Sequence, residues 1–189
     1  ESLSVPSSAG STWCCQTQMQ SLGLLFHCCL LPCGESQKNR TLCAKLCKEL
    51  DTLLCSLPKR TLPILLTDAN GHVGYRAFEG EWEKGYSSAI GPYATAHENA
   101  NGKALTDLLE THNMVAANTF QSGAPTYYHG DGKHTSTVDY VCTPRSCLPS
   151  ISSCATDTDL GVQLQLIKSA HTRDHFPVLL NMHFRTWHD

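Results

Sequence analysis

The segment that decides the fold is Leu62-Pro-Ile-Leu-Leu-Thr-Asp68. It is a short apolar run that ends in a carboxylate, the pattern of a buried strand with a polar side chain at its C-terminal end. On its N-terminal side, leucines recur at helical spacing over residues 41–57 with charged residues between them, and Pro58 follows. This pattern predicts an amphipathic helix that ends before Pro58.

After Asp68, predicted loops, helices and strands alternate. Residues 69–99 are rich in Gly, Ser and charge and predict a loop. Asn101-Gly102 opens a predicted helix that turns leucines inward, and residues 114–120 are apolar and predict the next strand. This order of elements predicts an α/β fold.

The last third of the chain predicts further strands. Residues 126–128 and 135–142 flank a segment rich in turn formers, which predicts a hairpin. Apolar and polar residues alternate over residues 162–168, which predicts a half-exposed strand, and residues 176–184 predict a final one.

Composition limits the class of protein. The chain has 189 residues, 41% hydrophobic and 16% charged, which suffices for one domain with a sizeable core. Its net charge of −3 excludes a protein held on nucleic acid by electrostatics alone. A site that handles phosphate must therefore be local and helped by a metal.

The two ends of the chain differ in pattern. Residues 1–40 are rich in cysteine and poorly patterned apart from a candidate strand at residues 22–30, whereas residues 41–189 hold the predicted elements. The longest apolar run, residues 22–32, is shorter than the roughly 20 residues that span a bilayer. We expect no transmembrane helix, no secretory signal because a basic n-region is lacking, and an intracellular fragment or processed product.

Eight of the 11 cysteines lie in the first 55 residues. An odd number argues against a disulfide framework. Zinc is the next interpretation, but Cys29/Cys33 and Cys43/Cys47 lack the C-x₂-C spacing, and His27 is the only histidine near them. Reduced thiols that pack as small hydrophobic side chains are the favoured interpretation.

Three polar clusters lie at the ends of predicted strands. They are Asp68-Ala-Asn70, Asp139 within Ser136-Thr-Val-Asp-Tyr140, and Asp174-His175. Together they supply oxygen ligands for a hard cation, a proton acceptor and a donor to a phosphoryl oxygen. Metal-assisted hydrolysis requires these groups.

In their order along the chain, these clusters resemble the endonuclease/exonuclease/phosphatase superfamily, and in particular the apurinic-type endonuclease domain of non-LTR (LINE-type) retrotransposons. The matching segments are Leu65-Leu-Thr-Asp-Ala-Asn-Gly-His-Val-Gly74, Asn101-Gly-Lys-Ala-Leu105, Asn118-Thr-Phe120, Thr126-Tyr127, Ser136-Thr-Val-Asp-Tyr140 and Arg173-Asp-His-Phe-Pro-Val178. The resemblance implies an α/β (α+β) fold, a two-sheet β-sandwich flanked by helices, which would be incomplete at the N-terminus.

The resemblance also implies catalytic roles. Asp68 would assist the attacking water or protonate the leaving oxygen, and Asn70 would donate a hydrogen bond to the scissile phosphate. His175 would bind a phosphate oxygen or act as the acid-base partner. Asp139 would hold the His175 ring in one tautomer, although a strand-end cap is the ordinary role for such a residue.

A metal ion and a nucleic acid follow from the same resemblance. Asp174 would be a ligand for Mg²⁺ or Mn²⁺, directly or through water. Asn118 would be a further site contact, with a turn former as the ordinary alternative. DNA would be the ancestral substrate, which would place the protein in the nucleus, and no membrane is implied.

The sequence departs from the family pattern at several positions. The family's main metal ligand is a Glu far upstream, whereas here Glu35 lies in a turn-like stretch and Glu49 in the predicted helix. Leu30 stands where the family has a tyrosine, Thr67 where it has Gly, and Arg173 where it has Ser. These departures predict an N-terminally truncated copy of a retroelement endonuclease with an incomplete metal site.

Three functions remain open on this basis. The first is a metal-dependent phosphodiester hydrolase, a DNA endonuclease weakened or inactivated by the loss of the metal-ligand Glu. The second is a non-catalytic remnant that binds a partner, such as a missing N-terminal half or a longer parent chain. The third is a phosphatase of the same superfamily.

Overall fold

The computed structural model describes residues 14–19, 24–34, 36–74, 87–94, 97–165 and 174–183. The strands are β1 (Cys14–Met19), β2 (Leu24–Leu30), β3 (Leu62–Asp68), β4 (Met114–Ala116), β5 (Tyr127–Tyr128), β6 (Thr135–Ser136), β7 (Asp139–Pro144), β8 (Ile151–Thr156), β9 (Asp174–His175) and β10 (Val178–Met182). The helices are α1 (Gln37–Ser56), α2 (Ala100–Thr111) and α3 (Thr158–Gln163), with 3₁₀ turns η2 (Ala117–Thr119) and η3 (Arg145–Ser150). None of the described helices is long and apolar enough to cross a membrane.

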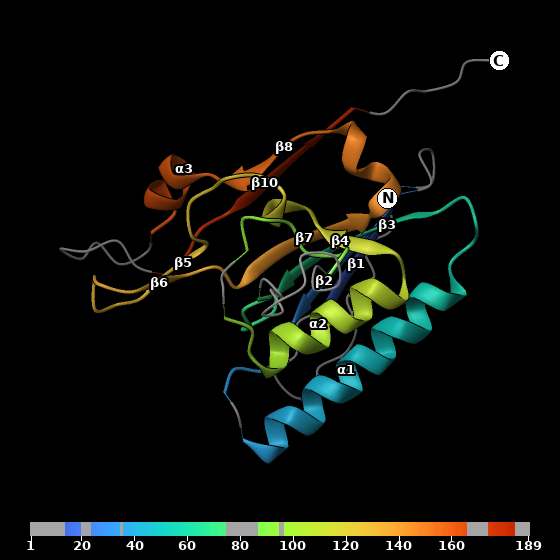
Figure 1. The fold of residues 1–189 in the computed structure, drawn as a ribbon, viewed down its shortest axis with the longest axis horizontal. Helices are drawn as coiled ribbons and strands as arrows, with labels where there is room; N and C mark the ends of the chain where they lie inside the picture. Colours follow the sequence, from blue (N-terminus) through green and yellow to red (C-terminus); the bar gives the residue numbers. More distant parts are fainter. Residues whose placement is uncertain are drawn as a thin grey trace, which may run out of the picture.

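A five-stranded sheet in the order β1-β2-β3-β7-β4 forms the centre of the molecule (Figure 1). β2 and β3 are parallel, and the other neighbours are antiparallel. β3 lies in the middle with Ile64 and Leu65 buried, which confirms the predicted buried strand. Because β3 has a partner on each side, its backbone groups are satisfied and its apolar side chains face two cores.

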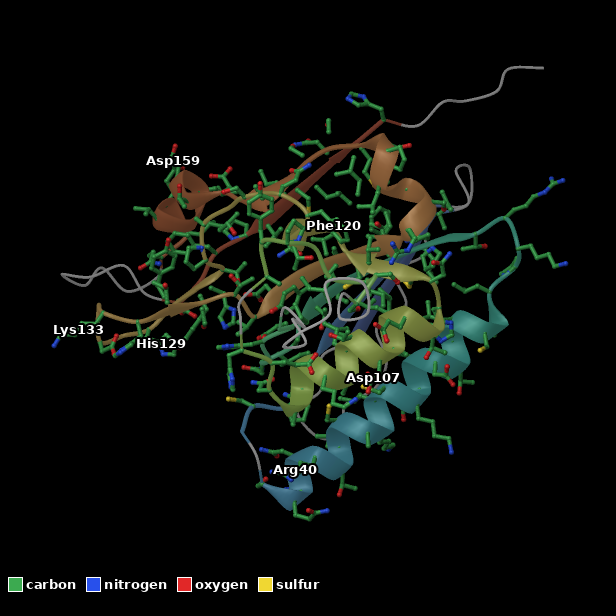
Figure 2. The ribbon with its side chains drawn as sticks, in the orientation of Figure 1. Arg40, Asp107, Phe120, His129, Lys133 and Asp159 are labelled. Carbon is green, nitrogen blue, oxygen red and sulfur yellow. The ribbon has the colours of Figure 1, made fainter. Side chains whose placement is uncertain are left out.

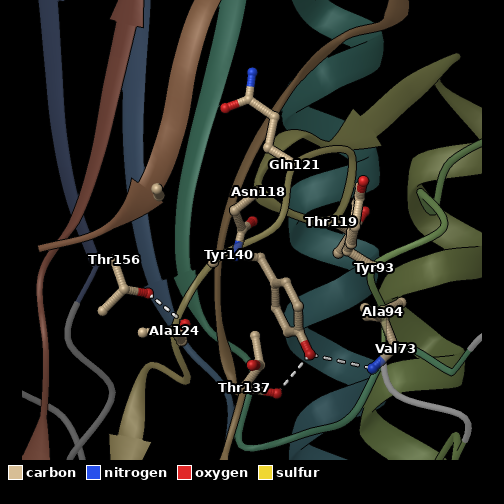
Figure 3. Close-up of a pocket in the computed structure, with 12 residues that line it drawn as sticks. Val73, Tyr93, Ala94, Asn118, Thr119, Gln121, Ala124, Thr137, Tyr140 and Thr156 are labelled. Atoms are coloured by element: carbon tan, nitrogen blue, oxygen red, sulfur yellow. Dashed lines mark hydrogen bonds between the residues drawn. The ribbon is translucent and has the colours of Figure 1, made fainter. Parts of the chain in front are cut away.

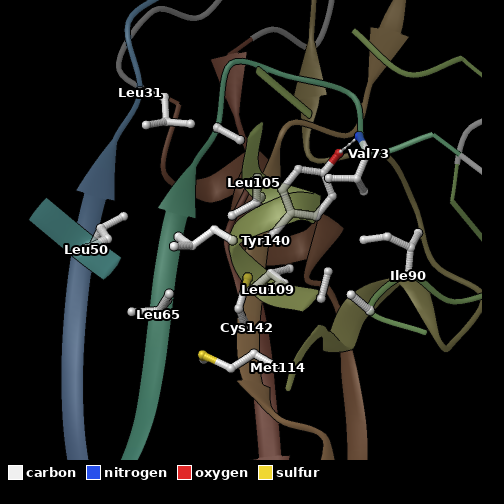
Figure 4. Packing of buried hydrophobic residues seen from close by; sticks show 14 of the residues in the cluster. Leu31, Leu50, Leu65, Val73, Ile90, Leu105, Leu109, Met114, Tyr140 and Cys142 are labelled. Carbon is white, nitrogen blue, oxygen red and sulfur yellow. Dashed lines mark hydrogen bonds between the residues drawn. The ribbon is translucent and has the colours of Figure 1, made fainter. Parts of the chain in front are cut away.

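The two faces of the central sheet pack against different layers. Helices α1 and α2 cover one face, where Leu65, Tyr140 and Cys142 join their leucines in a single core (Figures 1 and 4). On the other face Ile64 and Val141 pack with residues of β8 and β10, which pair as a second, antiparallel sheet. Side chains alternate between the faces with the strand period of two. The α/β architecture of two facing sheets with helices outside is thus confirmed.

Both long helices are capped by polar side chains. Ser36 precedes α1 and its Oγ accepts a hydrogen bond from the backbone N–H of Asn39, at 3.2 Å, so the helix begins at Gln37 rather than where the leucine pattern starts. It ends at Ser56, two residues before Pro58, as predicted. Asn99 caps α2 by accepting from the N–H of Gly102 at 2.9 Å.

Two predicted strands are shorter than their apolar patterns indicated. The run at residues 114–120 pairs only as β4, because the chain turns into η2 after Ala116, where the Thr119 hydroxyl donates to the Ala116 carbonyl at 2.6 Å. The segment at residues 135–142 divides into β6 and β7. The hairpin is confirmed by the antiparallel pairing of Tyr127 with Ser136 and of Tyr128 with Thr135.

The strand predicted at residues 162–168 is wrong over its described part. Residues 158–163 form α3, capped by Asp157, whose Oδ1 accepts from the N–H of Leu160 at 2.8 Å. Val162 and Leu164 are 56% and 60% exposed, so the alternation reflects no buried sheet face. The cap and the close packing of Gly161 on Phe176 outweigh a weak local pattern. Residues 166–168 lie outside the described residues.

The remaining strand predictions hold in part. The candidate strand at residues 22–30 is β2, and the final strand is β10, with Phe184 outside the described residues. β1 has no counterpart among the predictions, because its sequence lacks an alternating pattern. Its pairing with β2 supplies backbone hydrogen bonds that do not depend on side-chain pattern.

Tyr140 offers a test of how the core fixes the loop that follows β3. Its buried hydroxyl accepts from the Val73 N–H at 3.2 Å and lies 3.0 Å from the Gly71 carbonyl and 2.7 Å from that of Thr137. We expect Tyr140→Phe to lower the free energy of unfolding by about 1–3 kcal/mol, because buried polar groups lose their partner. Urea denaturation measures this, with Tyr93→Phe as the control because Tyr93 is 60% exposed. Equal effects of the two substitutions would contradict it.

Candidate active site

The register of β3 on β7 places two carboxylates side by side. Asp68 is the last residue of β3 and Asp139 the first of β7, and their Cα atoms are partners in the antiparallel ladder. His175 reaches the same place from β9, which pairs with β5 through Tyr127. Three of the predicted site residues, from distant parts of the sequence, therefore meet at one end of the central sheet.

The imidazole of His175 lies between the two carboxylates. Its Nδ1 is 3.0 Å from Oδ2 and 3.2 Å from Oδ1 of Asp139. Its Nε2 is 3.8 Å from Oδ2 of Asp68. The side chains of His175, Asp68 and Asp139 are 39%, 22% and 20% exposed, so the ring is open to solvent while the carboxylates are mostly covered.

This geometry shifts the protonation of two groups. The hydrogen bond to Asp139 raises the pKa of His175 above its ordinary value, with help from the charges of Asp139, Asp68 and Asp174 and against the effect of burial. Burial raises the pKa of Asp68, and the charge of Asp139 adds to it, while the Asn70 N–H and His175 act in the opposite direction. Both shifts favour the protonated forms, so His175 and Asp68 hold their protons up to a higher pH than the free side chains do.

Asn70 and Asp174 flank these three residues in strained backbone. Both have positive φ, 42° and 80°, in the left-handed region that Asn and Asp tolerate better than most residues. The Asn70 N–H donates to Asp68 Oδ1 at 2.9 Å, and its side-chain amide donates to the Leu31 carbonyl at 2.9 Å, which leaves its second amide N–H available to a ligand. Asp174 is exposed, and its Oδ1 accepts from the His175 N–H at 3.0 Å.

Asn118 lies behind the site. Its amide donates to the Asp139 carbonyl at 3.1 Å and accepts from the Val141 N–H at 3.3 Å. It borders a cavity of about 30 Å³ beside Tyr140, which has room for a water molecule (Figure 3). In this arrangement Asn118 fixes the start of β7, and any contact with a substrate stays a prediction.

Thr126 links the segments that carry Asp139 and His175. Its hydroxyl accepts from the N–H groups of Val138 and Asp139 at 3.0 and 3.1 Å, and its carbonyl accepts from the Phe176 N–H at 2.7 Å. The side chain is 1% exposed. Neither Thr126 nor Tyr127 was assigned a role from the sequence. The Thr126-Tyr127 motif was the sequence signal that could have identified them.

Asn101 holds the turn after β3 in the same way. Its side-chain amide donates to the carbonyls of Pro32 and Ala69, at 3.0 and 3.1 Å. The next residue must be glycine, because a Cβ on Gly102 would come within 1.8 Å of the His72 carbonyl oxygen. The Asn101-Gly102 motif thus fixes the loop that carries Asn70.

A pocket of about 610 Å³ opens in front of His175. Its lining is rich in aromatic and imidazole rings: His72, Tyr127, His129, His134 and His175, with Asn70 beside them. The ring of Tyr127 lies 4.7 Å from those of both His175 and His129. Figure 2 shows His129 and Lys133 on the hairpin of β5 and β6, which projects from one side of the molecule. Of these lining residues, only Asn70 and His175 were assigned roles from the sequence.

The donor set at this site fits a divalent cation. One oxygen or nitrogen from each of Asp68, Asp139 and His175 lies within 4.8 Å of the others. Mg²⁺ is commonly held by one or two carboxylates together with water and substrate phosphates, so these two carboxylates are of the kind that such an ion takes. Within the described part of the chain, Asp174 is in no such group. Its role as a metal ligand stays a prediction.

The positions that depart from the family pattern can be located in part. Leu30 is the register partner of Asp68 on β2, so an apolar side chain stands directly beside the site. Thr67 is buried, and its hydroxyl points to the sulfur of Cys29 at 4.0 Å. Glu49 lies on α1, exposed and 3.8 Å from Lys45, and Glu35 and Arg173 lie outside the described residues.

Nine of the cysteines whose side chains the structure describes are thiols that form no disulfide. They are Cys28, Cys29, Cys33, Cys43, Cys47, Cys55, Cys142, Cys147 and Cys154, of which Cys43, Cys142, Cys147 and Cys154 are buried. Burial raises the pKa of Cys154 to about 12, which keeps that thiol protonated and inert. The buried members agree with the interpretation of small hydrophobic side chains.

Solved structures with the same architecture are DNA-processing enzymes. A 3′ phosphatase, NExo, from Neisseria and the endonuclease domain of TRAS1, a telomere-specific non-LTR retrotransposon, each superpose with a TM-score of 0.59, at 12% and 14% identity. They cover 92% and 93% of this chain, which spans 65% and 64% of theirs. An AP endonuclease from Archaeoglobus fulgidus matches at the same TM-score and 12% identity, over 96% of this chain and 70% of its own.

These likenesses define the class by its fold. The chain has the exonuclease/endonuclease/phosphatase fold, and it spans less than two thirds of the length of the first structures it matches. No protein-family model and no curated protein matches the sequence.

The pairing of His175 with Asp139 predicts a titration that needs no substrate. In metal-free protein we expect the pKa of His175 to exceed the ordinary 6.5, because Asp139 stabilises the imidazolium. Asp139→Asn should lower that pKa, since it removes the largest cause of the shift. NMR titration of the imidazole resonances measures this, with Asp131→Asn as the control, because Asp131 contacts His134 in the turn between β5 and β6 whereas His175 contacts Asp139. An unchanged His175 titration in Asp139→Asn would refute the pairing.

Proposed function

We propose that the protein is a metal-dependent phosphodiester hydrolase that acts on DNA. The observation that carries the proposal is the alignment of Asp68, His175 and Asp139, with a pocket of about 610 Å³ in front of His175 and a second of about 360 Å³ lined by the two carboxylates. Two carboxylates and an imidazolium at these distances supply a charge stabiliser and a proton-transfer group for phosphoryl chemistry. The likeness in fold to a 3′ phosphatase and two endonucleases supports this class of reaction.

His175 binds the scissile phosphate in this proposal. The Nδ1 of His175 donates to Asp139. Its Nε2 then lies on the side of the ring near Asp68 and can donate to a phosphoryl oxygen. Because Asp139 raises the pKa of His175, the ring carries a positive charge over a wider pH range than a free imidazole. Asp139 orients the ring and fixes which nitrogen faces the substrate.

Asp68 moves the proton. Its raised pKa brings it closer to the working pH of a general acid or base, so it either accepts a proton from the attacking water or returns one to the leaving oxygen. The second amide N–H of Asn70, in the same pocket as His175, donates to the phosphate beside it. The positive φ of Asn70 turns the chain directly after β3, which keeps the side chains of Asp68 and Asn70 at the strand end.

Mg²⁺ or Mn²⁺ would be held by Asp68 and Asp139, with Asp174 acting directly or through water. Bound there, the ion would polarise a phosphoryl oxygen and neutralise charge that develops in the transition state. Asp174 approaches from β9 on the exposed side of His175. Among the described residues no glutamate joins the group of Asp68, Asp139 and His175, so we expect weak turnover.

Two finer assignments belong to the same proposal. The six ordered motifs and the likeness to the TRAS1 endonuclease domain support an origin in a non-LTR retroelement. A DNA substrate implies an intracellular location, in the nucleus for such an element. A non-catalytic remnant remains the alternative if the site has lost its metal.

Cleavage of supercoiled and abasic-site DNA in the presence of Mg²⁺ or Mn²⁺ tests the proposal. We expect slow nicking that falls about 10²–10⁴-fold in His175→Ala, because an acid-base or charge-stabilising group is lost. His183→Ala is the matched control, since His183 is an exposed residue just after β10.

The possible outcomes separate the three functions. Nicking that persists in His175→Ala would overturn the site assignment. Release of inorganic phosphate from a 3′-phosphorylated oligonucleotide, with intact strands, would identify a phosphatase. A folded protein without either activity would be a non-catalytic remnant.

Metal binding tests the assignment of Asp174 separately. Isothermal calorimetry with Mn²⁺ should detect binding to the wild-type protein, weakened about tenfold or more in Asp174→Asn, because even indirect partners of a metal contribute that much. Asp159→Asn is the control, since Asp159 is an exposed carboxylate on α3 (Figure 2) that belongs to no group of metal-ligating side chains among the described residues. Equal affinities in the two variants would remove Asp174 from the ligand set.

A further inference from the structure

A second group of metal-ligating side chains lies where α1 meets α2. The helices pack side by side on one face of the central sheet (Figure 1). Near the end of each, Asp51 and Cys55 of α1 meet His112, the residue that caps the C-terminus of α2. One carboxylate oxygen, the sulfur and a ring nitrogen all lie within 4.8 Å of one another.

The sequence places these three groups together for simple reasons. Asp51 and Cys55 are four residues apart on a helix and therefore share a face. His112 is fixed by its backbone N–H, which donates to the Leu108 carbonyl at 3.2 Å. Its Nε2 is 2.8 Å from Oδ1 of Asp51, and its side chain is 12% exposed. The ring therefore points along a defined direction toward α1.

The group lies at the opposite end of the sheet from Asp68. α1 ends just before β3 begins, and His112 just before β4, whose Met114 pairs with Pro144 at the far end of β7 from Asp139. The two ends of the seven-residue β3 are roughly 20 Å apart at about 3.3 Å per residue. The group shares no residue with the catalytic proposal.

We propose that Asp51, Cys55 and His112 form a zinc site. A thiolate, an imidazole and a carboxylate are the three donor types that zinc takes in proteins, whereas Mg²⁺ and Ca²⁺ select oxygen alone. Tetrahedral zinc, with bonds of about 2.0–2.3 Å, separates its ligand atoms by roughly 3.3–3.8 Å. The three donors lie within 4.8 Å of one another, so small side-chain movements bring them to that spacing, and the Asp51–His112 contact of 2.8 Å must open slightly to admit the ion.

The site has three protein ligands and an open position. Cys55 is exposed, and Asp51 has a side chain 47% exposed, so solvent reaches the group and a water completes the tetrahedron. Binding replaces the thiol proton of Cys55 by the metal and releases that proton to solvent. Bound zinc would cross-link the last turns of α1 to the end of α2. If Asp51 and His112 formed only an ion pair, Cys55 would have no role in this group.

Alkylation of the free thiols with and without zinc tests the site. In the folded wild-type protein, Zn²⁺ should slow the reaction of Cys55 with iodoacetamide, read by mass spectrometry, and leave the exposed Cys33 unaffected. His112→Ala and Asp51→Asn should each raise the zinc concentration needed for this protection by at least about tenfold, since the loss of an indirect partner alone costs that much.

Cobalt substitution gives a second measurement that identifies the sulfur ligand. Co²⁺ bound to the protein should show a thiolate-to-metal charge-transfer band, lost in Cys55→Ala and retained in Cys33→Ala, with folding checked by circular dichroism. Cys55 that reacts equally with and without zinc would overturn the proposal. So would protection that is unchanged in His112→Ala, because the metal would then be held by other thiols.

Discussion

The register between β3 and β7 is the constraint on which the site depends. It sets Asp68 directly opposite Asp139, so two carboxylates share the end of the sheet. Like charges at this distance repel, and the structure offsets the repulsion in two ways: the pKa of Asp68 rises, and His175 lies between the two groups. A shift of the register by one residue would turn one carboxylate to the other face of the sheet and separate it from the other two side chains.

Hydrogen bonds to the backbone make that register reliable. Asn118 binds the main chain on both sides of Tyr140, and Thr126 accepts the N–H of Asp139 while its own carbonyl holds the residue after His175. These are neutral side chains, mostly buried, whose partners are main-chain groups. Such bonds position the charged residues without adding charge of their own, which gives the motifs of Asn118 and Thr126 a structural role at the site.

The sequence predicted the elements whose residue pattern reflects burial. It was a weak guide where tertiary contacts determine the local structure. β3, α1, α2 and the hairpin follow from apolar periodicity and caps, and the grouping of Asp68, Asp139 and His175 followed from their place at strand ends. α3 was predicted as a strand because Val162 and Leu164 mimic alternation, although both are exposed. The pocket rings His72, His129 and His134 come together through tertiary pairing alone, and no local pattern marks them.

The charge of the site gives a divalent cation a role in the proposed reaction. With His175 protonated, the carboxylates of Asp68, Asp139 and Asp174 still leave the cluster negative, and a phosphodiester brings a further negative charge. An anionic substrate approaches such a cluster only if Asp68 takes up a proton or a divalent ion binds. The raised pKa of Asp68 supplies part of this neutralisation. Since the side chain of Leu30, the register partner of Asp68 on β2, carries no charge, a metal ion would supply the rest in the proposed reaction.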